Sequence, residues 1–246
     1  MPTANPNEGC IVPGGKNIYG VPVGILMLHT RFPRIPGDVG HASTWPFPVI
    51  YRVVQNASPH AVVRELTGDE WLEPFVAAAL ELEQTGVELI TTGCGFLVLF
   101  QQELQRRLHI PILTSSLLQI PWISSLMPAD RSIGILTVEA RSLTEAHLRS
   151  AGAPADRKLT VLGMEEAGGY FTNQLLEDQP ELDVERCRAE HIRAAQLLME
   201  RDSELGAIVL ECANMPPYAD LIRKVTGLPV YDLTTFVRWA MTGIET

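Results

Sequence analysis

Short apolar runs alternate with amphipathic segments along most of the chain. The apolar runs are too short for buried helices, and flanking Gly and Pro residues favour strands. The predicted strands lie at 21–28, 49–54, 89–94, 110–113, 131–137, 159–163, 207–212 and 228–231. Apolar residues at helical spacing predict helices at about 69–84, 97–108, 142–151 and 183–201, with a closing helix that ends near residue 243. Regular alternation of strand and helix predicts an α/β fold with parallel sheets.

Two of these runs repeat each other. Leu89-Ile90-Thr91-Thr92-Gly93-Cys94-Gly95 and Ala207-Ile208-Val209-Leu210-Glu211-Cys212-Ala213 each end on a cysteine and lead into a helix-like segment. Pro111 follows Cys94 and Pro229 follows Cys212 at the same spacing. The two cysteines and the two prolines are therefore offset by the same number of residues, since 212 − 94 and 229 − 111 are both 118. Cys94 and Cys212 therefore occupy equivalent places in two copies of one unit, and we expect them to face each other across a shared cleft.

The repeat predicts two pseudo-symmetric lobes, each a mainly parallel sheet flanked by helices, with the active site in the cleft between them. Gly134-Ile135-Leu136 matches Gly24-Ile25-Leu26 at the shorter offset of 134 − 24 = 110, as expected if a long loop belongs to one half only. We predict an N-terminal tail at 1–19, a first lobe at 20–125 plus 230–246, and a second lobe at 126–229.

A long segment at 29–46 has no strong helix or strand signal and follows the first predicted strand. Loops of this length in compact domains are usually functional or disordered. Ligands bind at the carboxyl ends of strands in α/β sheets, so the polar residues of this loop are candidates for the site. They are His29, Arg31, Arg34, Asp38 and His41.

Composition narrows the class of partner. The formal charge is −10 and Lys and Arg do not cluster, so nucleic acid is not expected as a partner. No apolar run reaches the roughly 18–20 residues of a membrane helix, and the first residues do not resemble a signal peptide. The four cysteines show neither a disulfide framework nor zinc spacing, so we expect a cytoplasmic protein with reduced thiols. The sequence leaves a homo-oligomer open.

Each repeated cysteine stands where a strand gives way to a helix. A helix N-terminus favours the thiolate and is expected to lower the thiol pKa below its usual ~8.5. Backbone N–H groups at the same place bind a carboxylate or an enolate-like oxygen. The candidate donors and neighbours are Gly95 and Phe96 at the first site and Ala213 and Asn214 at the second.

Two thiols on opposite faces of one carbon can invert a stereocentre, because one removes a proton and the other returns one. No metal site, phosphate loop or dinucleotide motif occurs, so we expect no cofactor. A buried cysteine is more often a small hydrophobe, and the matched pair is what favours function. Cys187 lies in a predicted helix with no repeat partner, and Cys10 lies in the tail; neither is assigned a role.

The chain resembles the aspartate/glutamate racemase superfamily, which includes hydantoin racemases, maleate isomerases and arylmalonate decarboxylases. The resemblance covers nearly the whole chain beyond the tail. It implies cofactor-independent proton transfer by Cys94 and Cys212, with a substrate carboxylate held by backbone amides, and a substrate contact from Thr137. Thr92 is a further candidate for a lesser substrate contact. The matching segments are Gly24-Ile25-Leu26, Ile90-Thr91-Thr92-Gly93-Cys94, Ile133-Gly134-Ile135-Leu136-Thr137, Ile208-Val209-Leu210-Glu211-Cys212 and Leu228-Pro229-Val230-Tyr231-Asp232.

The chain departs from the amino-acid racemases at both thiols. Those enzymes carry Cys-Asn-Thr and Gly-Cys-Thr, whereas this chain has Cys94-Gly95-Phe96 and Glu211-Cys212-Ala213-Asn214-Met215. The second run is more similar to the Cys-Ala-Gly-Met of hydantoin racemases. Phe96 favours a more apolar pocket than one built for aspartate or glutamate.

The sequence therefore predicts a cofactor-independent racemase or epimerase that acts on a small carboxylate or a cyclic amide. A cis–trans isomerase or a decarboxylase could use the same thiols. A small-molecule-binding protein without turnover is the alternative from another class. Glu165 and Glu166 are further candidates for the site.

Overall fold

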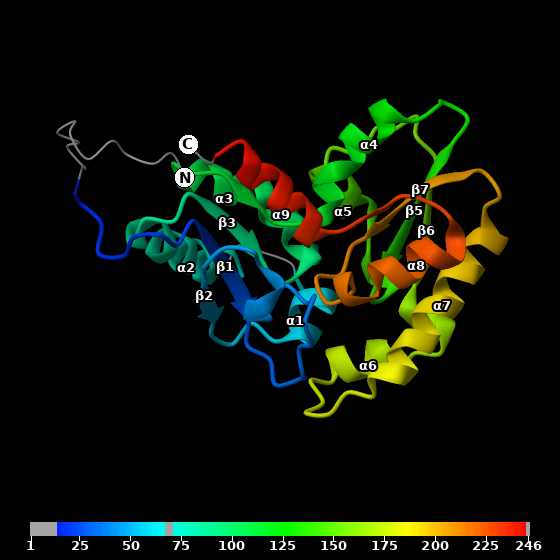
Figure 1. Cartoon of the computed structure of the whole chain (residues 1–246), viewed down its shortest axis with the longest axis horizontal. Coiled ribbons are helices and arrows are strands. Elements are labelled where there is room, and N and C mark those ends of the chain that lie inside the picture. The colour runs from blue at the N-terminus through cyan, green and yellow to red at the C-terminus, as the bar shows by residue number, and fades with distance from the viewer. Residues whose placement is uncertain (1–13, 67–70, 245–246) are drawn as a thin grey trace, which may run out of the picture.

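The computed structural model of the 246-residue chain describes residues 14–66 and 71–244. They form two lobes side by side, each with a four-stranded parallel sheet and flanking helices (Figure 1). The predicted α/β class with two lobes is confirmed. The part of the predicted tail before residue 14, with Cys10, lies outside the described residues.

The two sheets have the same strand order. The first is β2-β1-β3-β4 and the second is β6-β5-β7-β8, and all pairings are parallel. Each lobe therefore places its first and third strands at the centre. The strands are β1 (Val23–Leu28), β2 (Val49–Val54), β3 (Leu89–Thr92), β4 (Ile112–Leu113), β5 (Ser132–Thr137), β6 (Leu159–Gly163), β7 (Leu205–Leu210) and β8 (Val230–Tyr231).

Helices connect the strands and cover the sheets. The α-helices are α1 (Pro59–Arg64), α2 (Leu72–Thr85), α3 (Gln101–Arg107), α4 (Ile120–Leu126), α5 (Glu145–Ser150), α6 (Tyr170–Leu176), α7 (Val184–Arg201), α8 (Ala219–Thr226) and α9 (Leu233–Thr242). Short 3₁₀ turns are η1 (Ala42–Thr44), η2 (Gly95–Phe100), η3 (Ser116–Gln119), η4 (Ala140–Ser142), η5 (Met164–Ala167) and η6 (Pro216–Tyr218). The sequence analysis did not predict α1, α4 and α6, each of six or seven residues, whereas the equally short α3 and α5 lie within longer segments of helical spacing.

The repeat extends to the packing of the long helices. Gly24 of β1 lies under Leu82 of α2, where an added Cβ would be 3.0 Å from a methyl carbon of Leu82. Gly134 of β5 lies under Leu198 of α7 in the same way, at 2.6 Å. In both lobes, a glycine on the first strand thus lets a leucine of the covering helix pack closely against the strand backbone.

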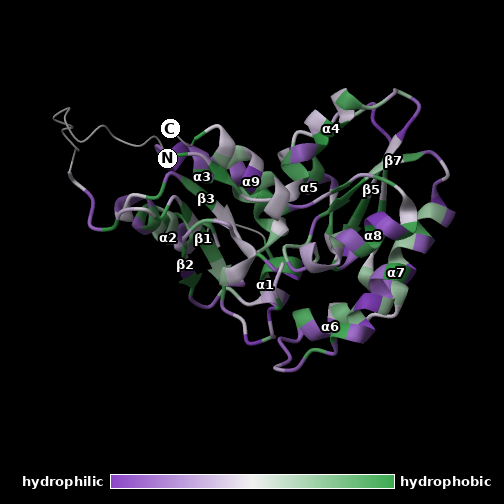
Figure 2. Cartoon of the chain, viewed as in Figure 1, coloured by the Kyte–Doolittle hydropathy of each residue, from purple (hydrophilic) through white to green (hydrophobic). Residues whose placement is uncertain are grey.

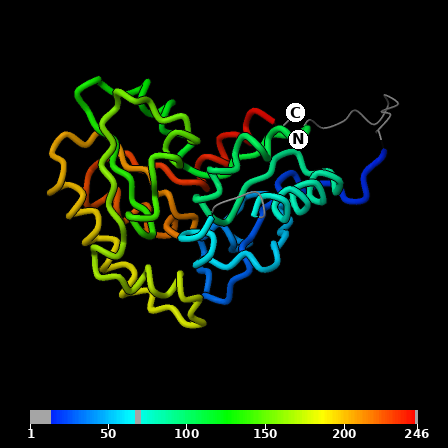
Figure 3. The backbone as a smooth tube through the Cα atoms, turned by 180° about the vertical axis from the view of Figure 1, so that it is seen from behind, coloured from blue at the N-terminus to red at the C-terminus, as the bar shows by residue number. Residues whose placement is uncertain are grey.

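The end of the chain joins both lobes. β8 pairs with β7, which places Val230 and Tyr231 in the second sheet, just beyond the predicted boundary at 229. The next element, α9, packs through Leu233, Val237 and Met241 into an apolar cluster on one face of the first sheet. Figure 3 shows this return of the chain to the first lobe from behind.

The strands are the most apolar parts of the molecule, and α7 turns its hydrophilic face outward (Figure 2). All six residues of β1 and of β5 are buried, as expected for central strands covered on both faces. Within the described ranges, no helix has the length and apolar character needed to cross a membrane.

Candidate functional site

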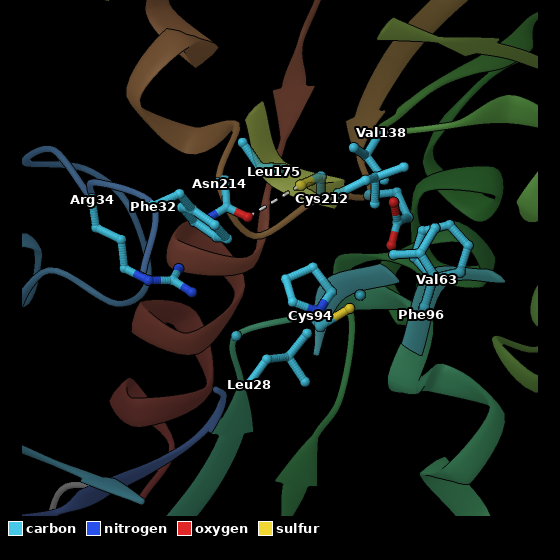
Figure 4. A pocket seen from close by; sticks show the side chains of 15 residues that line it. Leu28, Phe32, Arg34, Val63, Cys94, Phe96, Val138, Leu175, Cys212 and Asn214 are labelled. Carbon is cyan, nitrogen blue, oxygen red and sulfur yellow. Dashed lines mark hydrogen bonds between the residues drawn. The ribbon is translucent and has the colours of Figure 1, made fainter. Parts of the chain in front are cut away.

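A small cavity of about 30 Å³ lies between the lobes, at the carboxyl ends of β1, β3 and β7. Both repeated cysteines line it, together with Arg34 and Glu211 and a wall that is mostly apolar (Figure 4). The other lining residues are Leu28, Phe32, Pro59, Val63, Gly93, Gly95, Phe96, Val138, Leu175, Leu176 and Asn214.

Cys94 lies just after the end of β3, and a residue of that strand fixes its position. It caps the N-terminus of η2, and its side chain is 8% exposed. The hydroxyl of Thr92 donates to the carbonyl oxygens of Cys94 (2.9 Å) and Thr114 (2.7 Å). The Thr92 hydroxyl therefore fixes the backbone turn that delivers the first thiol to the cavity.

Cys212 is oriented by a chain of polar contacts that starts in the 29–46 loop. Arg34 donates to one carboxylate oxygen of Asp38 (2.9 Å), and the other oxygen accepts from the Asn214 side-chain amide (2.6 Å). This contact fixes the amide so that its oxygen accepts the proton of the Cys212 thiol at 3.5 Å, the dashed line in Figure 4. Arg34 and Asp38, two candidates from the loop, thus belong to the site.

Glu211 is the site residue whose role sequence reasoning missed. It precedes Cys212, its side chain is fully buried, and Oε2 accepts from the Thr137 hydroxyl at 2.8 Å. Burial raises the pKa of Glu211 to about 8, although the Thr137 hydroxyl and the Val138 N–H act in the opposite direction. The signal in the sequence was an acidic residue at the end of an otherwise apolar strand.

The environment of the thiols differs from the one expected at helix N-termini. Burial and the nearby Glu211 raise the pKa of Cys94 to about 12, and the same two causes raise the pKa of Cys212 well above its usual value. The prediction of a lowered thiol pKa was wrong, because desolvation outweighs the backbone N–H groups of Phe96 and Asn214. At Cys212 no helix begins directly, since η6 starts only at Pro216.

Part of the apolar wall comes from two short helices, one from each lobe. α1 supplies Pro59 and Val63, and α6 supplies Leu175 and Leu176. Just past α6, Asp178 accepts from the backbone N–H groups of Arg31 (2.5 Å) and Phe32 (3.2 Å). This contact ties the loop that carries Phe32 and Arg34 to the second lobe.

The structure gathers only some of the predicted substrate contacts around the cavity. Gly95, Phe96 and Asn214 line it, whereas Thr92, Thr137 and Ala213 are not among its lining residues in the described chain. Thr92 and Thr137 lie just behind, holding Cys94 and Glu211. The carbonyl oxygen of Ala213 accepts from the N–H of Val39 at 3.3 Å, and its methyl group packs in the core.

The remaining candidates lie elsewhere. His41 caps η1, the backbone N–H of His29 donates to Ala57, and neither lines the cavity within the described residues. Glu165 accepts from the N–H of Ala140, and Glu166 pairs with Arg201 at 2.6 Å.

Cys187 is buried in α7, outside the residues that line the cavity. Among the described residues, no group of three or more His, Cys, Asp and Glu side chains is placed to hold a metal.

Sequence similarity to curated proteins extends over most of the chain. It is 30% identical over 227 residues to a dimethylsulfoniopropionate lyase of Durusdinium sp. clade D, and the aligned region covers 89% of this chain and 74% of that protein. It is 28% identical over 243 residues to dimethylsulfoniopropionate lyase 6 of Emiliania huxleyi (strain CCMP1516), covering 96% of this chain and 61% of that protein. No family model matches the chain.

Solved structures share the fold at low identity. Glutamate racemase from Francisella tularensis in complex with D-glutamate superposes with a TM-score of 0.56 at 13% identity, covering 92% of this chain and 81% of that one. Allantoin racemase from Pseudomonas fluorescens superposes with a TM-score of 0.52 at 16% identity, covering 90% and 91%. The chain therefore has the fold of the aspartate/glutamate racemase superfamily, as predicted, and it belongs to the dimethylsulfoniopropionate lyase family.

Proposed function

We propose that the chain is a lyase that splits a small carboxylate bearing a dimethylsulfonium group into dimethyl sulfide and an unsaturated acid. The observation that carries this proposal is the 30% identity to a dimethylsulfoniopropionate lyase over 89% of the chain. The predicted isomerase activity is a different reaction, but it begins with the same step, removal of a proton from the carbon beside a carboxylate.

The chemistry needs one base and a leaving group. A thiolate takes a proton from the carbon next to the carboxylate, and the C–H electron pair becomes the new carbon–carbon double bond. The bond between the next carbon and the sulfonium sulfur breaks, and its electron pair leaves on dimethyl sulfide. The products are acrylate, neutral dimethyl sulfide and one proton, which stays on the thiol until water removes it.

The cavity has parts that suit this substrate. The substrate carboxylate can be held by Arg34 and by the backbone N–H of Phe96 beside Cys94. The methyl groups on sulfur suit the apolar wall formed by Val63 and Leu175. Thr92 and Thr137 then act behind the site, by positioning Cys94 and Glu211.

The raised pKa of both thiols fits a base that is activated only when substrate is present. A positive charge within about 4–6 Å favours the ionised form of an acid. The sulfonium group would bring that charge into a dry cavity, where it acts more strongly than in water. Their raised pKa values thus keep Cys94 and Cys212 protonated and less reactive toward oxidants before substrate binds.

The experiment is to incubate the protein with dimethylsulfoniopropionate and to measure dimethyl sulfide by gas chromatography and acrylate by NMR. We expect equal amounts of both products and loss of both in the Cys94→Ser, Cys212→Ser double variant. Absence of dimethyl sulfide from folded wild-type protein would refute the proposal.

Racemisation is the second candidate, and one observation favours it. The two thiols come from equivalent positions of the two lobes and line one cavity, as a two-base proton transfer requires. The test follows hydrogen–deuterium exchange at the α-carbon of small chiral carboxylates and hydantoins, with Cys94→Ser and Cys212→Ser separately. Full exchange of both enantiomers in both variants would rule out the two-base scheme.

A further inference from the structure

Glu211 has an oxygen that the fold leaves unused. Oε2 accepts from Thr137, but Oε1 has no hydrogen-bond partner among the described residues, although the side chain is fully buried. A buried carboxyl oxygen without a partner costs free energy, and such a group in a native protein calls for an explanation. Because Glu211 lines the cavity, the missing partner is best sought in a ligand.

The opposite lobe makes room for this side chain. A Cβ atom at position 95 would overlap both the carbonyl oxygen and Oε1 of Glu211. The absence of a side chain at Gly95 thus leaves room for the Glu211 carboxyl group next to Cys94. Glu211 also acts electrostatically on both thiols, because its charge is a cause of the raised pKa of Cys94 and of Cys212. The carboxyl group is therefore placed close to both candidate bases.

The other charges around the cavity do not balance a carboxylate at 211. Arg34 lines the cavity, but its guanidinium is paired with Asp38 at 2.9 Å. Among the described residues, the other titratable side chains that line the cavity are Cys94 from the first lobe and Cys212 beside Glu211 itself. Within the described part of the chain, no unpaired cation lines the cavity to balance an ionised Glu211, and a cationic ligand group would supply one.

We propose that Glu211 is the specificity-determining residue for a positively charged group on the substrate, one that bears methyl groups and lies two carbons from the carboxylate. This inference deepens the proposed lyase function and rests on it for the position of the substrate carboxylate. The carboxylate end lies toward Arg34 and the cationic end toward Oε1 of Glu211. The ligand class is a small zwitterion with a sulfonium or quaternary ammonium group, and carboxylates of the same shape without a positive charge are disfavoured.

Binding can be separated from turnover with two unreactive probes of nearly equal shape. 3-(Trimethylammonio)propionate carries the positive charge but a poor leaving group, and 4,4-dimethylpentanoate replaces the nitrogen by carbon. Dissociation constants for both are measured by calorimetry on wild type, on Glu211→Gln and on Glu166→Gln. Glutamine keeps the size and the contact with Thr137, and Glu166 is a control because it faces Arg201.

We expect wild type and Glu166→Gln to bind the zwitterionic ammonium probe at least tenfold more tightly than the anionic 4,4-dimethylpentanoate, and Glu211→Gln to lose that preference. A second readout needs only wild-type protein. At pH 7, entry of the ammonium group ionises Glu211, so titrations in two buffers of different ionisation enthalpy should reveal proton release with the zwitterionic probe and not with 4,4-dimethylpentanoate.

The inference is overturned if folded Glu211→Gln retains the wild-type preference, or if wild type shows neither preference nor proton release. The lyase assay distinguishes this from failure of the proposed function. Dimethyl sulfide production together with an unchanged preference in Glu211→Gln overturns the role of Glu211 alone. A Glu211-dependent preference without dimethyl sulfide production supports the role of Glu211 and refutes the lyase.

Discussion

The two cysteine segments descend from one pattern, yet they build different halves of the cavity. Cys94 lies between Gly93 and Gly95 and caps a six-residue 3₁₀ helix, with only backbone atoms on either side. Cys212 follows Glu211 and donates its thiol proton to Asn214. The first lobe contributes space and N–H groups, and the second contributes an acid and an amide.

This difference shows how a duplicated scaffold acquires a directional site. Strand order and helix packing are the same in both lobes because they bury the same kind of core. Side chains at the strand ends do not have to fill this core, so the side chains at these positions could diverge between the two lobes. An asymmetric cavity suits an elimination, in which one base acts and a leaving group departs, better than a symmetric exchange of protons.

The largest expected effect comes from removing each thiol in turn. In a one-base elimination, Cys94→Ser and Cys212→Ser should differ more than tenfold in kcat/KM for dimethylsulfoniopropionate. The variant that loses the base should fall by about 10²–10⁴. Cys187→Ser is the matched control, because that buried thiol is not among the lining residues and should leave kcat/KM unchanged. Equal losses in both variants would instead indicate that the lobes act symmetrically.

The next effect tests the space that the first lobe provides. Gly95→Ala places a methyl group against the Glu211 backbone and carboxyl group, so we expect a loss of about 1–3 kcal/mol in the free energy of unfolding. Gly93→Ala should cost less, because its new Cβ would meet mainly the end of the flexible Met27 side chain, at 2.8 Å from the sulfur. Urea denaturation measures both. Similar values for the two variants would contradict the close contact between Gly95 and Glu211.

A third effect comes from Glu211, the acid that the second lobe provides. Burial raises its pKa in the folded protein to about 8, compared with about 4.3 in the unfolded chain. The protonated side chain therefore contributes its full stability below about pH 4.3, and this contribution is lost as the pH rises toward 8. Between pH 6 and 7 the wild type should lose about 1.4 kcal/mol relative to Glu211→Gln. Denaturation at a series of pH values measures the difference, and parallel curves for the two proteins would show that Glu211 titrates normally.

The smallest effect separates support of the cysteine turn from substrate contact. Thr92→Val removes the hydroxyl that donates to the carbonyl of Cys94, and we expect a loss of about 1 kcal/mol in stability with a lower kcat and little change in KM. Thr91→Val is the control, since that buried hydroxyl donates to Leu113 at 2.8 Å and holds no thiol, so kcat should not change. A large rise in KM for Thr92→Val alone would favour the direct substrate contact expected from the sequence.

Much of the fold was predictable because it depends on local patterns and on their repetition. The apolar runs at 49–54 and 159–163 coincide with β2 and β6, and the long helix at 183–201 coincides closely with α7. The helices α1 and α6 were not predicted, because no longer segment of helical spacing surrounds their six or seven residues. Those two helices supply four residues of the apolar wall, so the sequence alone could not describe the shape of the cavity.

The sequence by itself determined the α/β class, the two-lobed repeat and the pair of cysteines, because burial imposes regular spacing on strands and helices and a repeat marks equivalent places. Only the tertiary structure decided how those thiols are surrounded. Glu211, Asn214 and Arg34 are far from Cys94 in the chain, and the pKa of a thiol depends on burial and charge in space. For that reason the predicted lowering of the thiol pKa was wrong, while the cysteines themselves were placed at one cavity.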